Sequence, residues 1–382
     1  MRLPSPRFLI GLGMVIVVCV GIGVLWNRSD GQHGSPTTAK STTVTCIGGS
    51  EKSELMADPK VTAILREKYR ITVDFSPLGS YDQVRLSTQD LKNRKVNCLW
   101  PSSASAQSVF ETTHKDAFAG YTAENVLQSP EVVYAGPRGT DALVKAGLVT
   151  QRDNRYYIVN IKSLLLDYVI KRRTWESIGA VDLRGPVGIA STDPAKSNSG
   201  FTMAQLELSI VATDDAYSAP GLDQARKALP TMRALYEAQG LQSRSSDAGF
   251  RQWLTQGAEL HAPLYAGYEN QLIQQVVQAG TASASLLANV RVLYPEPTIY
   301  SDHPILALDA DAARFITAMK DPEIQSVAWH TYGFRSAVAV GTTNAADFTG
   351  LGLADQIRTT PPPAGDVTLA LLGGVTDAKT CQ

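Results

Sequence analysis

The chain contains 382 residues with a formal net charge of −1, and 44% of its residues are hydrophobic. This near-neutral charge argues against nucleic acid or a strongly charged surface as a partner. About 300 residues follow the N-terminal segments described next, which is enough for two lobes of ordinary domain size. We therefore expect a small-molecule or inorganic-ion ligand.

An apolar segment near the N-terminus is typical of a membrane anchor. Residues 8–26 contain no charge, and nineteen residues are long enough to cross the roughly 30 Å hydrocarbon core as a helix. Arg2 and Arg7 precede the segment, whereas Arg28 after it is balanced by Asp30, which predicts a cytoplasmic N-terminus and an extracytoplasmic main domain. No small-x-small cleavage site follows, which favours a retained anchor, with a cleaved signal peptide as the alternative.

The flanking segments complete this topology. Residues 1–7 are expected to be a cytoplasmic N-terminus. Residues 27–42 are mostly polar and small, so we expect a flexible linker between the anchor and the folded part.

Three cysteines follow the predicted anchor, namely Cys46, Cys98 and Cys381. An oxidising compartment favours pairing of two of them, and the sequence does not fix which two. Cys46 and Cys98 each end a predicted buried strand, so a disulfide between neighbouring strands is our first choice. No CxxC pair or HxxxH spacing occurs, and we expect no zinc site.

The first part of the folded chain alternates between strands and helices. This βαβα order predicts a parallel sheet, and three successive strands run into loops rich in Gly and Ser. Strands are expected at 44–47, 71–75, 95–100 and 131–135, and helices at 52–69 and 81–91.

The same alternation restarts near residue 140 and predicts a second α/β unit. It gives helices at 141–146, 161–173, 200–211, 222–239, 247–256 and 269–277 and strands at 156–160 and 187–190, followed by strands at 290–294 and 298–301 and helices at 309–320 and 322–332. Residues 346–382 are rich in Thr, Ala, Gly and Pro with one apolar run at 367–372, so a C-terminal tail is expected.

The stretch STDPAKSNSGFT at 191–202 is the most informative motif, because it follows a predicted strand and opens a helix. A helix start has free backbone N–H groups, and capping side chains beside them form a cradle for an anion or an oxygen ligand. The simpler interpretation is that Ser199 only caps the helix. Polar turns follow three other strands, and ligands collect at the carboxyl ends of parallel strands, so we expect the turns to converge. The candidate ligand-binding residues in these turns are Ser50, Glu51, Ser80, Tyr81, Ser102, Ser103, Ser197, Asn198 and Ser199.

Several short motifs together resemble the bacterial extracellular solute-binding proteins of the type II periplasmic-binding-protein class. They are STDPAKSNSG at 191–200, AGYEN at 266–270, YPEPTIYSDHP at 294–304 and QSVAWHTYGFRS at 325–336. The resemblance covers about residues 43–340. It implies an α/β fold of two lobes, each a mixed sheet flanked by helices, that close on a ligand. Lobe 1 would comprise residues 43–138 and 290–345, and lobe 2 residues 139–289.

The resemblance also implies roles for site residues. Ser50 and Glu51 match the first-strand loop, Ser80 and Ser102 the next two loops, residues 197–199 the helix start of the second lobe, and Tyr268 with Glu269 a wall beside the hinge. Relatives that bind phosphate or molybdate have a leaner Gly/Ser first loop. Because a carboxylate in the pocket repels a bare oxyanion, Glu51 puts oxyanion binding in doubt unless it faces away.

No feature of the sequence predicts catalysis. The G-x-S-x-G, H-E-x-x-H and phosphate-loop patterns are absent, and we expect no catalytic residues, no cofactor and no metal ligands. His261 and His303 lie near prolines and are expected to be loop histidines. The expected function is a membrane-tethered extracytoplasmic solute-binding protein that serves ABC-type uptake with a transporter permease. The alternative is a ligand-free or sensory scaffold that works with a cell-surface partner.

Overall fold

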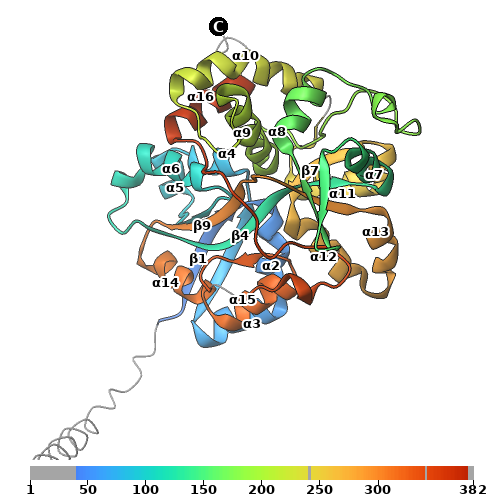
Figure 1. The fold of residues 1–382 in the computed structure, drawn as a ribbon. Coiled ribbons are helices and arrows are strands. Elements are labelled where there is room, and N and C mark those ends of the chain that lie inside the picture. The colour runs from blue at the N-terminus through green and yellow to red at the C-terminus, as the bar shows by residue number, and fades with distance from the viewer. Residues whose placement is uncertain (1–39, 240–241, 340–341, 377–382) are drawn as a thin grey trace, which may run out of the picture. The chain divides into compact units, whose positions relative to one another are not determined.

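The structure is a computed structural model that describes residues 40–239, 242–339 and 342–376 (Figure 1). The predicted cytoplasmic segment 1–7, the predicted anchor 8–26, most of the linker 27–42 and Cys381 lie outside these ranges. Among the helices in these ranges, none combines the length and the apolar character that a membrane crossing requires. A compact unit starts at Thr42 and contains all the strands and helices named below.

In the described part of the chain, ten strands form one continuous sheet with two halves, and the long strand β4, Thr122–Ala135, takes part in both. The first half-sheet has the order β2-β1-β3-β9-β4, with β10 also paired to β4. β1 pairs in parallel with β2 and β3, as the βαβα order predicts, whereas β9 is antiparallel to β3 and β4. The remaining strands of this half are β1 Thr42–Gly48, β2 Ile71–Pro77, β3 Cys98–Trp100, β9 Tyr300–Ala307 and β10 Arg335–Ser336.

The second half-sheet is built on the last residues of β4. Residues 131–135 pair with β7 and residues 133–135 with β8, and β8 continues the sheet through β6 to β5. Its strands are β5 Val149–Arg152, β6 Tyr156–Val159, β7 Leu264–Tyr268 and β8 Arg291–Pro295.

Helices pack around both half-sheets (Figure 1). They are α2 Ser53–Ala57, α3 Pro59–Lys68, α4 Ser80–Val84, α5 Thr88–Asn93, α6 Ala104–Thr113, α7 Pro137–Lys145, α8 Ile161–Ser163, α9 Asn198–Thr213, α10 Leu222–Ala238, α11 Ser246–Thr255, α12 Glu269–Ala279, α13 Ser283–Asn289, α14 Ala310–Met319, α15 Pro322–His330 and α16 Gly365–Thr376.

The single helix expected at 52–69 is divided at Asp58. Asp58 adopts an extended conformation, and its side chain accepts hydrogen bonds from the backbone N–H groups of Lys60 and Val61. Pro59 follows at the first helical position, where its missing N–H is no loss. These two residues therefore start a new helix, α3, rather than continuing α2.

Within the described residues a disulfide joins Cys46 of β1 to Cys98 of β3. The two residues are directly opposite each other in neighbouring parallel strands. This is the pair that the sequence favours, and it fixes the two strands whose loops lead toward the candidate site.

Strand pairing amends the lobe boundaries that the sequence suggests. The sequence places β8 in lobe 1, but β8 pairs with β4 and β6 of the second half-sheet. The chain returns to the first half-sheet only at β9, and it first leaves that half within β4 rather than after residue 138. We therefore propose that β8 belongs to lobe 2 and that β4 crosses between the lobes.

The expected C-terminal tail also contains an ordered, buried helix. α16 packs against α10 and α6, and its apolar residues join the core formed by α9, α10 and the first half-sheet (Figure 1). Within this core the rings of Tyr81 and Phe201 lie 4.4 Å apart. Apolar packing thus links the first half-sheet to α9, so a separation of these elements exposes hydrophobic surface.

Substitution of Leu371 tests the buried position of α16. Leu371 is fully buried, so Leu371→Ala is expected to lower the free energy of unfolding by about 2–5 kcal/mol, through lost burial and the cavity left behind. Leu369 on the same helix is 40% exposed, and Leu369→Ala is the matched control, with an expected change within about 0.5 kcal/mol. Equal, small effects of both substitutions in urea denaturation contradict the packed position of α16.

Candidate functional site

A pocket of about 300 Å³ lies where the loops after β1 and β2 face the starts of α9 and α11. The loops after β1 and β2, which belong to the first half-sheet, form one wall of the pocket. The residues before α9 and α11 form the opposite wall. Its lining residues are Gly49, Ser50, Glu51, Pro77, Leu78, Gly79, Ser80, Lys196, Ser197, Asn198, Arg244, Ser245 and Ser246. The lining is rich in hydroxyl groups, and its charged side chains are one carboxylate and two cations.

Direct contacts join the two walls of this pocket. The Ser50 and Ser245 hydroxyl oxygens are 3.1 Å apart, and the Asn198 amide donates to the backbone oxygen of Ser102 at 2.6 Å. A Cβ added at Gly79 would lie 2.6 Å from the backbone oxygen of Lys196, so a glycine is required for this close approach. The structure is therefore a closed arrangement of the two walls.

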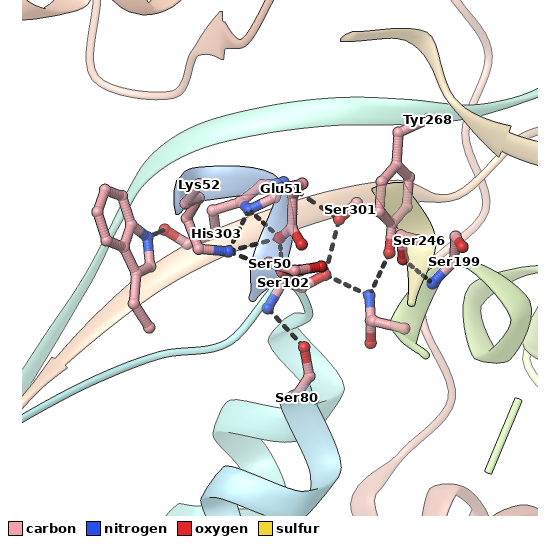
Figure 2. A network of polar contacts seen from close by, with 12 residues as sticks. Ser50, Glu51, Lys52, Ser80, Ser102, Ser199, Ser246, Tyr268, Ser301 and His303 are labelled. Carbon is pink, nitrogen blue, oxygen red and sulfur yellow. Dashed lines mark hydrogen bonds and ion pairs between the residues drawn. The ribbon is translucent and has the colours of Figure 1, made fainter. Parts of the chain in front are cut away.

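A buried polar cluster stands behind the β1 loop (Figure 2). The Lys52 ammonium is fully buried and donates to Glu51 Oε1 at 2.6 Å and to the Ser102 hydroxyl at 2.8 Å. It also lies 3.0 Å from Nδ1 of His303. All three ammonium protons of Lys52 thus have an acceptor nearby.

Lys52 determines the ionisation of this cluster. Burial by itself raises the pKa of the Glu51 carboxyl, but the charge and hydrogen bond of Lys52, helped by the hydrogen bond from Ser102, outweigh burial and lower the pKa to about 2. Burial and the neighbouring ammonium hold the pKa of His303 well below its usual range, so its imidazole is neutral and accepts from Lys52. Burial lowers the pKa of Lys52, whereas the charge and hydrogen bond of Glu51 oppose that shift, so we infer that the two side chains form an ion pair with no net charge.

Hydroxyl groups also gather at the start of α9. Thr192 Oγ1 accepts from the backbone N–H of Gly200 and bonds to the hydroxyls of Ser197 and Ser199, at 2.8 to 2.9 Å. Ser197 occupies the N-cap position of α9 without a side-chain hydrogen bond to the first turn. Its hydroxyl bonds instead to Thr192 and to Ser246 of α11, so it faces the pocket without capping the helix.

Asn198 is held in place from two sides. Its amide group donates to the backbone oxygen of Ser102 and, at 2.8 Å, to the Tyr268 hydroxyl. Burial raises the pKa of Tyr268 well above its usual range, so this hydroxyl stays protonated. Tyr268 therefore positions a pocket residue from behind.

Five of the sequence-predicted residues line the pocket together: Ser50, Glu51, Ser80, Ser197 and Asn198. Three more lie directly behind them. Ser102 contacts Glu51, Lys52 and Asn198, Tyr268 holds Asn198, and Ser199 bonds to Thr192 beside Ser197. Ser199 is 1% exposed, so it supports the wall rather than forming it.

The other three predicted residues neither line the pocket nor support the residues that do. Tyr81 packs on Phe201 in the apolar core, and Ser103 caps α6 through the N–H groups of Ser105 and Ala106. Glu269 is fully buried and accepts two hydrogen bonds from the Arg335 guanidinium, at 2.7 and 2.9 Å. Its carboxylate is paired with Arg335 and does not line this pocket, so a role of Glu269 as a wall beside the hinge stays a prediction.

Local sequence patterns do not predict the remaining pocket residues. Arg244, Ser245 and Ser246 follow no predicted strand, although Ser245 caps α11 through the N–H of Ala248, as a Ser before a helix often does. His303 is expected in a loop from the sequence, but it lies in β9 and is fully buried. The described residues contain no group of three or more His, Cys, Asp or Glu side chains arranged to hold a metal ion.

The two pocket cations have no ion-pair partner among the described residues. Lys196 and Arg244 line the pocket, and neither side chain takes part in a salt bridge within those ranges. Because Lys52 balances the charge of Glu51, Lys196 and Arg244 leave the pocket with a net positive charge. The positive end of the α9 helix dipole adds to this preference for a negative ligand.

Comparisons with known proteins identify the fold. No family model and no curated protein matches the sequence. Among solved structures, a ferric binding protein from Campylobacter jejuni matches with a TM-score of 0.58 and 10% identity over 88% of this chain and 99% of its own. A protein described as a two-component system protein that mediates signal transduction matches with a TM-score of 0.53 and 9% identity over 86% and 100%.

A third structure is the substrate binding protein of an ABC transporter from Agrobacterium tumefaciens, with a TM-score of 0.50 and 13% identity over 91% of this chain and 96% of its own. Each of these structures is matched over nearly its whole length. The chain therefore has the two-lobed α/β fold of the periplasmic substrate-binding proteins, which the sequence motifs predicted. At these low sequence identities the similarity shows the fold alone. The lining of the pocket is the evidence that bears on the ligand.

Proposed function

We propose that the protein captures a small anionic solute in the pocket between the β1 and β2 loops and the starts of α9 and α11. The proposal rests on one observation: two cations without ion-pair partners among the described residues, Lys196 and Arg244, lie in a pocket lined by serine hydroxyls and a helix start. No bond is made or broken, and the two walls close on the ligand.

The chemistry of the pocket favours an anion with several oxygen atoms. Serine hydroxyls and the Asn198 amide donate to such oxygens, and Lys196 and Arg244 provide charge-assisted hydrogen bonds, which are stronger than neutral ones. Glu51 does not oppose this choice, because Lys52 neutralises it in place. An inorganic oxyanion, a phosphorylated metabolite or a small carboxylate fits this description and a pocket of about 300 Å³.

Three further observations bear on the cellular role: the disulfide, the apolar segment near the N-terminus and one of the similar structures. The disulfide between Cys46 and Cys98 supports an oxidising, extracytoplasmic compartment. Residues 8–26 would tether the domain to the membrane as a single-pass anchor with a cytoplasmic N-terminus. We propose that the captured solute is delivered to an ABC transporter permease, since the similar protein from Agrobacterium tumefaciens is the substrate binding protein of an ABC transporter.

A sensory role is the second candidate. One similar structure is described as a signal transduction protein, and a retained anchor suits a sensor that needs a fixed location. The apolar core that links α9 to the first half-sheet also favours a domain that moves little. A sensor and a transport receptor share the pocket, whereas a scaffold without a ligand does not.

A thermal-shift screen of the full-length chain tests the proposal. The compounds are sulfate, phosphate, glucose 6-phosphate, citrate and succinate, each as the sodium salt, with sodium chloride at matched ionic strength as reference. At least one anion is expected to raise the melting temperature, since a ligand that binds only the folded state stabilises it by RT ln(1 + [L]/Kd).

Charge variants then locate the effect. The double variant Lys196→Gln/Arg244→Gln is expected to weaken binding of that anion at least about tenfold, because each charged hydrogen bond contributes about 1.5–3 kcal/mol. Arg226→Gln, at an exposed position of α10, is the matched control and should bind like the wild type. The proposal fails if no anion raises the melting temperature, or if the double variant binds as tightly as the control.

A further inference from the structure

A second pocket, of about 420 Å³, lies between β7, α11 and the residues that follow α10. Tyr265 of β7 and Trp253 of α11 contribute aromatic walls, and Ser191 lies on the segment that leads to α9. The second pocket shares no lining residue with the anion pocket.

Two residues that line this pocket carry buried hydroxyl groups without a hydrogen-bond partner among the described residues. Ser191 is 7% exposed and Tyr265 is 5% exposed, both side chains line the pocket, and neither hydroxyl has a partner among the described residues. Buried hydroxyls are nearly always hydrogen-bonded in folded proteins, because burying one without a partner is unfavourable. Their presence in the same pocket indicates a ligand that supplies the missing partners.

The rest of the lining defines the chemistry of that ligand. Gln239, Gln252 and Gln256 provide amides that both donate and accept, and His261 adds an imidazole. No Asp, Glu, Lys or Arg among the described residues lines the pocket, so a charged ligand would lose its hydration without gaining a counter-charge. A neutral molecule with several hydroxyl groups matches both features, since each of its hydroxyls donates and accepts.

We propose that this pocket is a second binding site, for a small neutral sugar or polyol, which contacts the hydroxyls of Ser191 and Tyr265. The site is distinct from the anion pocket in position and in charge. Both pockets nevertheless share a segment of chain, because Thr192, the neighbour of Ser191, holds the serines at the start of α9. A test therefore has to measure both kinds of binding in each variant.

Titration calorimetry of the full-length chain tests this site. The protein is held in a detergent without a sugar headgroup, and the probes are glucose, galactose, mannose, xylose and myo-inositol at millimolar concentrations. At least one probe is expected to bind with one-to-one stoichiometry. Tyr265→Phe and Ser191→Ala should each weaken its binding at least about tenfold, because each removes one hydrogen-bonding group from the contact.

Two further measurements distinguish the loss of the sugar site from a damaged fold: the melting temperature of the ligand-free variants and the sugar binding of a control variant. Each substitution removes a buried hydroxyl without a partner among the described residues, so the melting temperature of the ligand-free variants is expected to equal or exceed that of the wild type. Ser50→Ala, at a residue that lines the anion pocket and not the second pocket, should leave sugar binding unchanged. The inference is overturned if no probe binds the wild type, if both hydroxyl variants bind like the wild type, or if these variants melt at lower temperature.

Discussion

Replacing Lys52 by methionine is expected to lower the free energy of unfolding by about 3–5 kcal/mol. The substitution leaves the Glu51 carboxylate buried without its counter-charge, and it removes hydrogen bonds to Glu51 and Ser102. Breaking one side of a buried ion pair costs more than the pair itself contributes, because the remaining charge is still removed from water. Urea denaturation of the wild type and the variant measures the difference.

A second substitution distinguishes charge from packing. In the double variant Glu51→Gln/Lys52→Met no charge remains in the cluster, so much of the lost stability should return. Lys227→Met, at an exposed position of α10, is the matched surface control and should change the free energy of unfolding by no more than about 0.5 kcal/mol. A loss below about 1 kcal/mol in Lys52→Met shows that Glu51 is not neutralised by Lys52, and its carboxylate then opposes an anion in the pocket.

Replacing Gly79 by valine is expected to weaken anion binding by about tenfold to a hundredfold. The backbone of Gly79, with φ −57° and ψ 145°, is accessible to any L-residue, so the substitution introduces no backbone strain. Its Cβ would lie 2.6 Å from the backbone oxygen of Lys196, which is possible only if the two walls move apart. Overpacking of this kind costs about 1–3 kcal/mol in the closed arrangement. Calorimetric titration with the most stabilising anion measures the affinity.

The melting temperature of ligand-free Gly79→Val shows whether the two walls of the pocket separate when no ligand is bound. If the ligand-free domain opens, the valine meets no clash and the melting temperature stays near that of the wild type. Gly188→Val is the matched control, since a Cβ at Gly188 meets nothing within 4 Å. A clear drop in the melting temperature with unchanged anion affinity contradicts capture by closure, and it is the result expected if the apolar core around Phe201 holds the walls together permanently.

Local sequence patterns predicted the half of the pocket that depends on chain order. Ser50, Ser80 and Ser197 follow strands or open helices, and the carboxyl ends of parallel strands meet at one edge of the sheet, so their convergence could be anticipated. The disulfide pair was favoured for a related reason, since Cys46 and Cys98 end neighbouring parallel strands.

The remaining features depend on partners that are distant in the sequence. Arg244 reaches the pocket only because α11 packs beside α9, and no local motif marks it. Glu269 is paired with Arg335, 66 residues away, and Lys52 lies beside His303, 251 residues away. Tertiary packing alone creates these two long-range contacts, and the first of them leaves the Glu269 carboxylate paired instead of free for a ligand.

The position of α16 has the same origin. Its residues 367–372 form one apolar run in a segment of Pro, Gly and Thr, and nothing in that run indicates the surface that it covers. The apolar residues of α16 are buried because the helix packs on α10 and α6.

A crystal structure grown with the anion that gives the largest thermal shift tests the central claim most directly. We expect electron density for that anion between Ser50, Ser197 and Arg244, with the Glu51 carboxylate still paired to Lys52. Density at another position, or an empty pocket with the walls closed as they are here, contradicts the claim that this protein captures an anionic solute at the start of α9.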